Sequence, residues 1–243
     1  MKPINNTVDD LFQPKELAAD EYLNKADGLI YCSKCHTPRQ HRIELKERVF
    51  FPTVRCRCQQ EEYDKHEAER KHQEFLMQVS RLRANGLQDK SLHDYNFTND
   101  KGYNPEIQKA HDYVAHWEEM KANSLGLLLW GDVGTGKSFF AGCIANALLD
   151  KGIPVLMTNF SRILNTLTGM YSDDRNQFID SFNKYSLLII DDLGIERSSE
   201  FALEQVFNVI DSRYRSKKPL IVTTNLTLDE LKHPKDLARA RIY

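Results

Sequence analysis

The chain has 243 residues, enough for one large domain or two modest ones. Its 33 Lys and Arg residues nearly balance its 35 Asp and Glu residues, and a net charge of −2 excludes a global attraction to nucleic acid. No apolar run approaches the ~20 residues of a membrane span, and the polar, acidic segment from Met1 to Asp20 is unlike a secretory signal. We therefore expect a cytoplasmic protein with no membrane partner, whose five cysteines serve metal binding or core packing.

Residues 1–58 combine a polar segment, helix-like from Pro14 to Ala26, with a cluster of four cysteines. The cysteines, all within residues 31–58, are spaced as C-x₂-C, twenty intervening residues and C-x-C. Two close pairs separated by a hairpin, which we place at residues 43–45 and 49–51, are what a tetrahedral structural zinc site needs. Four thiolates leave no open position for catalysis, and so small a module depends on metal for much of its stability. The predicted zinc ligands are Cys32, Cys35, Cys56 and Cys58.

Alternatives for this region stay open. His36 or His41 is a possible substitute ligand, and a redox-active dithiol is a further interpretation. Basic residues surround the cysteines, which indicates contact with nucleic acid or with an acidic protein surface, or simply a solvated face. These residues are Lys34, Arg39, Arg42, Lys46, Arg48, Arg55 and Arg57.

Residues 59–92 are dense in Glu, Lys, Arg, His and Gln, which predicts an exposed, charged helical linker. One apolar cluster, Phe75-Leu76-Met77, interrupts this pattern. From residue 93 to residue 243 the composition becomes that of an α/β domain.

The most informative motif lies at residues 127–138, where an apolar run LLLW is followed by GDVGTGKS and then by a helical pattern. The glycines let the backbone curl so that its N–H groups point at phosphate oxygens, and the helix adds its positive dipole end. We expect Lys137 to reach the β- and γ-phosphates and the Ser138 hydroxyl to bind Mg²⁺. We expect Cys143, in the following helix, to be a buried core thiol. The predicted ATP-binding residues are Gly131, Asp132, Val133, Gly134, Thr135, Gly136, Lys137, Ser138 and Phe139.

Two further strand ends complete the predicted site. The buried run LLII ends in Asp191 and Asp192; we expect Asp191 to bind Mg²⁺ and Asp192 to polarise the attacking water. The alternative is that Asp191 and Asp192 cap a helix and have no catalytic role. The run PLIVTT at residues 219–224 ends at Asn225, whose amide is placed to hydrogen-bond that water, unless it is an ordinary loop residue.

These strands alternate with helices. A short strand is expected at residues 154–158, and helices are expected near 160–171, 174–185 and 199–216. The alternation predicts an α/β fold with a parallel sheet flanked by helices, and with nucleotide at the carboxyl ends of the strands.

The motifs GDVGTGKS, LLIIDD and TTN, in this order and spacing, resemble those of the AAA+ ATPases. The continuation SFFAGCIAN and the later helix containing VIDSRY resemble bacterial and phage helicase loaders of the DnaC/DnaI type, and the related IstB-type transposition ATPases. The similarity covers about residues 90–243. The zinc module is similar to that of DnaI-type loaders, although its C-x-C pair departs from the pattern expected there.

The resemblance implies an arginine-containing helix after the third motif, followed by a last strand. Residues 237–243 are similar to the start of that helix, so we expect the C-terminal end of the AAA+ domain to be missing from this sequence. Arg241 is the candidate for the arginine that reaches a neighbouring subunit's γ-phosphate; an arginine beyond the C-terminus and a plain surface role for Arg241 are the alternatives.

The resemblance also implies a function. Loaders of this type bind the replicative hexameric helicase through the N-terminal region, bind single-stranded DNA through the ATPase domain, and self-associate with ATP. It thus implies a weak or assembly-dependent ATPase that uses ATP, Mg²⁺ and Zn²⁺ in the initiation of DNA replication. The candidate DNA contacts, between Phe160 and Lys184, are Arg162, Tyr171, Arg175 and Lys184.

Three other functions compete with this one. A transposase-helper ATPase would bind transposase rather than helicase, and the zinc module argues against it. A metabolic kinase would need a phosphoacceptor pocket, whereas Asp192 beside Asp191 favours water activation. A pure interaction protein would bind ATP without turnover.

Overall fold

The computed structural model of the chain describes residues 17–45, 48–194, 199–234 and 239–242. The chain divides into two compact units between Glu74 and Phe75. Within these described ranges, no helix is long and apolar enough to cross a membrane.

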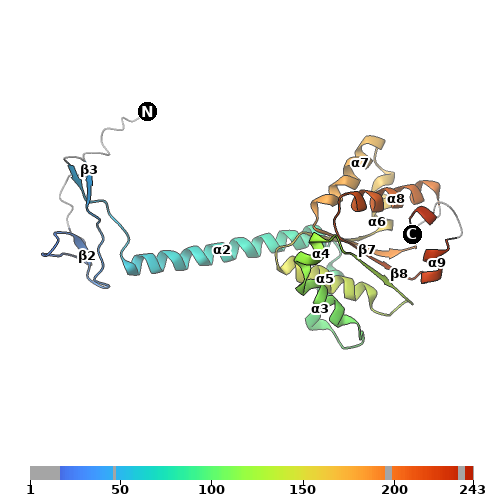
Figure 1. Cartoon of the computed structure of the whole chain (residues 1–243), viewed down its shortest axis with the longest axis horizontal. Helices are drawn as coiled ribbons and strands as arrows, with labels where there is room; N and C mark the ends of the chain where they lie inside the picture. The colour runs from blue at the N-terminus through green and yellow to red at the C-terminus, as the bar shows by residue number, and fades with distance from the viewer. Residues whose placement is uncertain (1–16, 46–47, 195–198, 235–238, 243) are drawn as a thin grey trace. The chain divides into compact units, whose positions relative to one another are not determined.

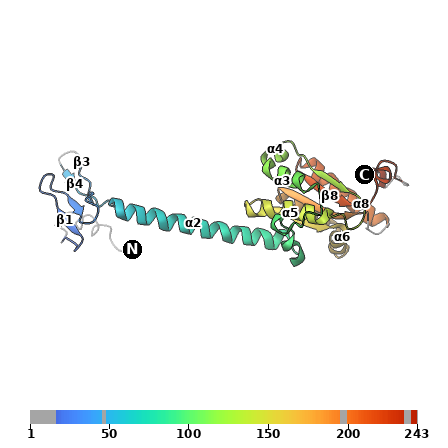
Figure 2. The same ribbon diagram turned by 90° about the horizontal axis from the view of Figure 1, so that it is seen from below.

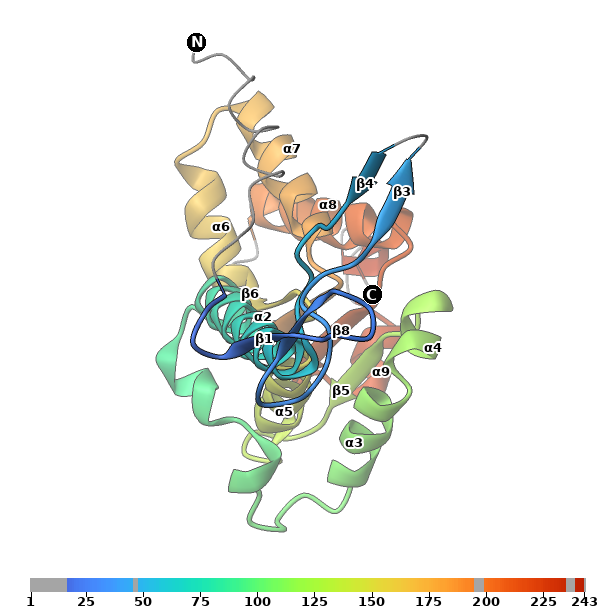
Figure 3. The ribbon, with the colours of Figure 1, turned by 90° about the vertical axis from the view of Figure 1, so that its left-hand side faces the viewer.

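The first unit contains two short antiparallel pairs of strands. Strand β1 (Glu21–Leu23) pairs with β2 (Ile30–Cys32), and β3 (Ile43–Leu45) pairs with β4 (Arg48–Phe50). Figure 3 shows β3 and β4 side by side as a hairpin. The hairpin predicted between the cysteine pairs is therefore confirmed, with its second strand one residue earlier than expected.

The helix predicted from Pro14 to Ala26 is wrong over residues 17–26, which form a turn followed by strand β1; residues 14–16 lie outside the described part of the chain. The local helical pattern is overridden because the segment pairs with β2, and Gly28 at φ +70° closes the connecting turn. Asp20 and Glu21 are further held by ion pairs to Arg39.

The predicted charged helix is confirmed as α2 (Arg57–Gly86), with the short 3₁₀ helix η1 (Lys90–Asp94) after it. Up to Glu74 its side chains are almost all exposed. The last turns belong to the second unit, where Arg83 forms an ion pair with Asp150. A Cβ on Gly86 would lie 2.0 Å from the carbonyl oxygen of Val155, so only glycine fits at this close approach.

The second unit is built on a four-stranded parallel sheet in the order β5-β8-β7-β6. Its strands are β5 (Leu127–Trp130), β6 (Val155–Asn159), β7 (Leu187–Leu193) and β8 (Leu220–Thr224). All four were predicted from apolar runs. Such continuous runs are expected of parallel strands that are covered on both faces. The edge strand β5 differs, because Leu128 and Trp130 on one of its faces are exposed.

Helices cover both faces of this sheet (Figure 1). On one face lie α6 (Phe160–Thr168), α7 (Ser172–Ser181) and α8 (Glu200–Arg215), which pack on a core that includes Leu188 and Ile190. On the other lie α3 (Ile107–Ala115), α4 (Trp117–Ala122) and α5 (Lys137–Asp150), which pack on a core that includes Leu187 and Ile189. Seen from below, α3 and α5 lie together in front of the sheet (Figure 2).

The remaining elements are short. They are η2 (Phe97–Asn99), η3 (Phe182–Lys184), α9 (Leu228–Lys232) and η4 (Arg239–Arg241). The predicted α/β architecture, a parallel sheet flanked by helices, is confirmed, and the helices expected near 160–171, 174–185 and 199–216 are all present within a few residues.

Candidate nucleotide site and metal centre

The glycine-rich loop connects the end of β5 to the first turn of α5. Gly131, Gly134 and Gly136 have φ of +140°, +85° and +84°, values that residues with a side chain rarely adopt. Val133, at the outside of the loop, is 83% exposed. The loop thus has the backbone curl, open surface and adjoining helix N-terminus that cradle an anion.

The Lys137 ammonium group lies over the loop. Its Nζ donates to the carbonyl oxygens of Gly131 at 2.8 Å and Asp132 at 2.7 Å, and contacts the Thr135 hydroxyl at 3.4 Å. A phosphate carries full negative charge and is a stronger partner for an ammonium group than these neutral acceptors. Lys137 is therefore positioned to exchange loop carbonyls for phosphate oxygens.

The structure brings Ser138 and Asp191 together, although they are far apart in the sequence. The Ser138 hydroxyl donates to Asp191 Oδ1 at 2.9 Å, and the Thr223 hydroxyl donates to the same oxygen at 2.6 Å. Hydroxyl and carboxylate oxygens are the donors that Mg²⁺ prefers. The predicted pair of magnesium ligands is thus adjacent, and its chemistry fits the ion.

Asp192 is half-buried and has φ +59°, the left-handed region. Burial raises the pKa of its carboxyl above the ordinary value, the neighbouring Asp191 raises it further, and Lys137 opposes both effects. A raised pKa makes a carboxylate a stronger base, which suits a group that is to polarise water.

Among the described side chains, one predicted residue is not joined to this cluster. Asn225 is exposed just beyond β8, and no hydrogen bond among the described residues joins it to Asp191 or Asp192. Arg241 falls in η4, and its side chain lies outside the described part of the structure.

Three residues near the loop carry no signal in the sequence that predicts a role in the site. The sequence pattern predicts only a strand at Thr223, although its hydroxyl donates to Asp191. The segment before α3 runs beside the loop: the Asn104 amide nitrogen lies 3.5 Å from the position of a Cβ on Gly136, and the Tyr95 ring contacts Phe139 at 5.6 Å between centroids. No motif marks this segment in the sequence.

The four predicted zinc ligands converge in the first unit. Their Sγ atoms all lie within 4.8 Å of one another, with 3.6 Å between Cys32 and Cys58 and 3.3 Å between Cys56 and Cys58. Tetrahedral zinc–thiolate geometry, with Zn–S of about 2.3 Å, requires sulfur–sulfur spacings of roughly 3.8 Å. The donor set therefore fits zinc. Within the described residues the cluster contains only these cysteines, so neither His36 nor His41 belongs to it.

Polar groups around the sulfurs favour thiolates. The Thr37 hydroxyl lies 3.1 Å from Cys35 Sγ and lowers the pKa of that thiol. The buried guanidinium of Arg39 donates to Cys32 Sγ at 3.6 Å while it is held by Asp20 and Glu21. Positive charge beside the sulfurs offsets the negative charge that four thiolates bring to a metal.

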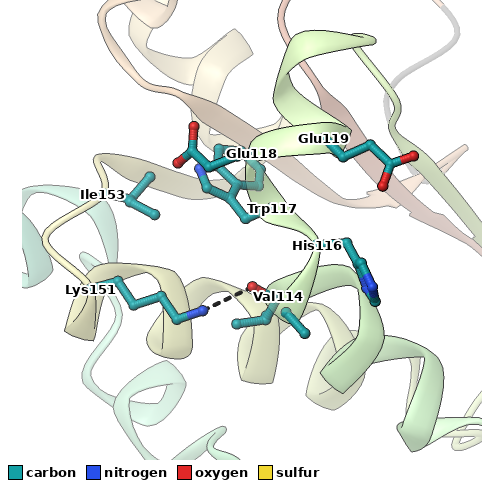
Figure 4. Close-up of a pocket in the computed structure, with 8 residues that line it drawn as sticks. Val114, His116, Trp117, Glu118, Glu119, Lys151 and Ile153 are labelled. Atoms are coloured by element: carbon teal, nitrogen blue, oxygen red, sulfur yellow. Dashed lines mark hydrogen bonds between the residues drawn. The ribbon is translucent and has the colours of Figure 1, made fainter.

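A separate hollow of about 400 Å³ lies by α4 and the end of α5 (Figure 4). Trp117 and Glu118 line it, and Lys151 Nζ beside them donates to the Val114 carbonyl oxygen at 2.9 Å. None of the predicted site residues lines this hollow.

Residues 52–236 match the family described as IstB-like ATP binding proteins. The chain belongs to this family. A segment of this IstB-like protein is 28% identical over 128 residues to the replicative helicase loader DnaC of Escherichia coli (strain K12), covering 51% of each chain. Another is 30% identical over 147 residues to the phage-like element PBSX protein XkdC of Bacillus subtilis (strain 168), covering 54% of this chain and 52% of XkdC.

A crystal structure of DnaI has a TM-score of 0.48 and 23% identity to this IstB-like protein, covering 63% of this chain and 87% of that one. The chain spans about half the length of the curated relatives it matches. The similarity to DnaC, which was predicted from the sequence motifs, is confirmed.

Proposed function

We propose that this IstB-like protein is an ATPase that loads the replicative DNA helicase during the initiation of DNA replication. The observation that carries the ATPase half is that the Lys137 loop, Ser138 and the acidic pair converge at the carboxyl ends of two strands, β5 and β7, and at the first turn of one helix, α5. The similarity to DnaC and the thiolate module support the loader half.

Each predicted residue has a proposed role. Ser138 and Asp191 would hold Mg²⁺, which neutralises phosphate charge when bound. The loop N–H groups and Lys137 would bind the β- and γ-phosphates, and Phe139 would lie beside the nucleotide. Asp192 would accept a proton from water that Asn225 orients. We assign Arg241 to a neighbouring subunit's γ-phosphate, which would link self-association to ATP.

The N-terminal region is proposed to contact the helicase through the β3–β4 hairpin. Ile43, Leu45 and Val49 are 39%, 61% and 39% exposed, an unusual amount of aliphatic surface for so short a hairpin. Exposed Arg48 adds positive charge beside them. Phe51, directly after β4, is 45% exposed and extends this apolar surface. An apolar patch beside a basic side chain suits the contact of a protein surface that carries apolar and acidic groups.

We also propose that the second unit binds single-stranded DNA. Arg162, Tyr171 and Lys184 are exposed, as DNA contacts must be. Arg175 is half-buried and its Nε donates to the carbonyl oxygens of Leu167 and Met170, which leaves its two terminal amino groups for a phosphate. These candidates lie on or beside α6, α7 and η3.

A binding experiment with the 243-residue chain tests the loader proposal. The wild type should bind purified hexameric helicase, and Leu45→Asp should weaken binding at least tenfold, because a charge replaces apolar contact area. Leu23→Asp is the matched control, since Leu23 is 54% exposed in the same unit but lies in β1, and it should bind like the wild type. Both variants should retain zinc.

The family match favours a second candidate, an ATPase that assists a transposase. If the wild type binds a purified transposase and not the helicase, this alternative replaces the loader proposal. Binding of the helicase that is equally strong for Leu45→Asp would remove the hairpin from the interface while leaving the loader function in place.

A further inference from the structure

Strand β7 carries an irregularity at the acidic pair. The pairing register with β8 shifts between Ile190 and Leu193, so that Asp191 and Asp192 together face a single residue, Thr223. Regular alternation would send adjacent side chains to opposite faces of the sheet, whereas a bulge re-aims them. The left-handed φ of Asp192, +59°, is part of this bulge.

One hydroxyl serves both acidic residues. Thr223 Oγ1 donates to Asp191 Oδ1 at 2.6 Å and accepts from the Asp192 backbone N–H at 2.9 Å. A hydroxyl has one proton and can accept as well, so a single threonine fulfils both functions. Thr223 has no exposed surface, and bulk water therefore has no access to replace its hydroxyl.

We propose that Thr223 is the positioning residue of the acidic pair, on the basis of the ATPase function proposed above. It fixes the rotamer of Asp191, the proposed magnesium ligand, and stabilises the left-handed backbone that directs Asp192. It acts only through these two residues and contacts no nucleotide.

The next residue provides a matched comparison. Thr224 is equally buried, and its hydroxyl also donates once and accepts once. Its partners are the Leu193 carbonyl oxygen at 2.7 Å and the Leu226 N–H at 3.1 Å, neither of them a carboxylate. A valine at either position removes one buried hydroxyl and keeps the volume, so the two variants should lose similar stability.

The test uses three variants of the 243-residue chain, Thr223→Val, Thr223→Ser and Thr224→Val. The measurements are kcat and KM for ATP, ATP affinity with and without Mg²⁺, and the unfolding temperature. Thr223→Val should lower kcat about 10- to 100-fold, the loss expected for one hydrogen bond to a charged group. In the wild type, ATP should bind more tightly with Mg²⁺ than in EDTA. Thr223→Val should lose this difference, while its affinity for ATP in EDTA stays that of the wild type. Thr223→Ser should restore both properties, and Thr224→Val should stay within about twofold of wild type.

Two results would overturn the positioning role. One is wild-type kcat and Mg²⁺-dependent affinity in Thr223→Val; the other is an equal loss in Thr224→Val. If the wild type itself hydrolyses no ATP, the proposed ATPase function fails, while the Mg²⁺-dependent affinities still decide for or against Thr223.

Discussion

Arg213 is a buried cation whose loss should strongly destabilise the second unit. It is 1% exposed, and its guanidinium donates to the carbonyl oxygens of Pro219, Tyr185 and Ser186 at 2.8–3.1 Å. These residues lie just before β7 and β8, so one side chain joins α8 to the starts of two strands. Burial lowers the pKa of Arg213 to about 10, and it stays charged at neutral pH.

The magnitude follows from these contacts. Four hydrogen bonds from a charged group at about 1.5–3 kcal/mol each give a gross ~6–12 kcal/mol. Several kcal/mol of that gain offset the cost of burying the charge. Arg213→Met keeps the apolar stem but leaves carbonyls unpaired, and we expect a net loss of about 3–5 kcal/mol. For a unit of this size, that lowers the unfolding temperature by about 6–20 °C.

Tryptophan fluorescence is the suitable assay, because both tryptophans, Trp117 and Trp130, belong to the second unit. Arg215→Met is the control. Arg215 is also on α8, but it forms an exposed i,i+4 ion pair with Asp211, worth about 0.5 kcal/mol or less. Unfolding of Arg213→Met within about 2 °C of the control would refute this account of the buried cation.

Two further predictions concern the metal centre and the acidic pair. Metal analysis should find about one zinc per chain. Cys32→Ser should release the zinc and unfold the first unit, while the affinity for ATP persists. A first unit that stays folded without metal would exclude a structural zinc site. Asp192→Asn should bind ATP normally but stop turnover, because an amide is a poor base. Since the pKa of Asp192 is raised, kcat of the wild type should fall as the pH is lowered through a value above the ordinary 3.8, because the protonated carboxyl no longer acts as a base. Unchanged turnover in Asp192→Asn would show that another group is the base.

The parts of the fold that sequence predicted well depend on short-range patterns. Glycines at residues 131, 134 and 136 predict a loop with left-handed backbone, and the apolar runs predict strands. Strand β5 is exposed on one face, at Leu128 and Trp130, which its apolar run does not predict. The cysteine pairs are equally local signals, since each pair supplies two ligands from one tight segment.

The parts that sequence missed depend on long-range contacts. Thr223 gains its role from a register shift in another strand, which no local pattern reveals. Arg213 looks like an ordinary basic residue at a helix end, yet it is buried and donates to the carbonyl oxygens of Tyr185 and Ser186, which are distant in the sequence. Glu21 is in a helix-like stretch, but pairing with Cys32 turns it into a strand.

The binding of ATP at the glycine-rich loop is the central claim, and titration with a fluorescent ATP analogue and Mg²⁺ tests it most directly. The wild type should bind, and Lys137→Ala should weaken binding about a hundredfold or more, because the phosphates lose their cationic partner. Lys151→Ala, at the other end of α5, should bind like the wild type, since Lys151 donates only to a backbone carbonyl near the separate hollow. Equal affinity of wild type and Lys137→Ala, or no binding by the wild type, would contradict the account.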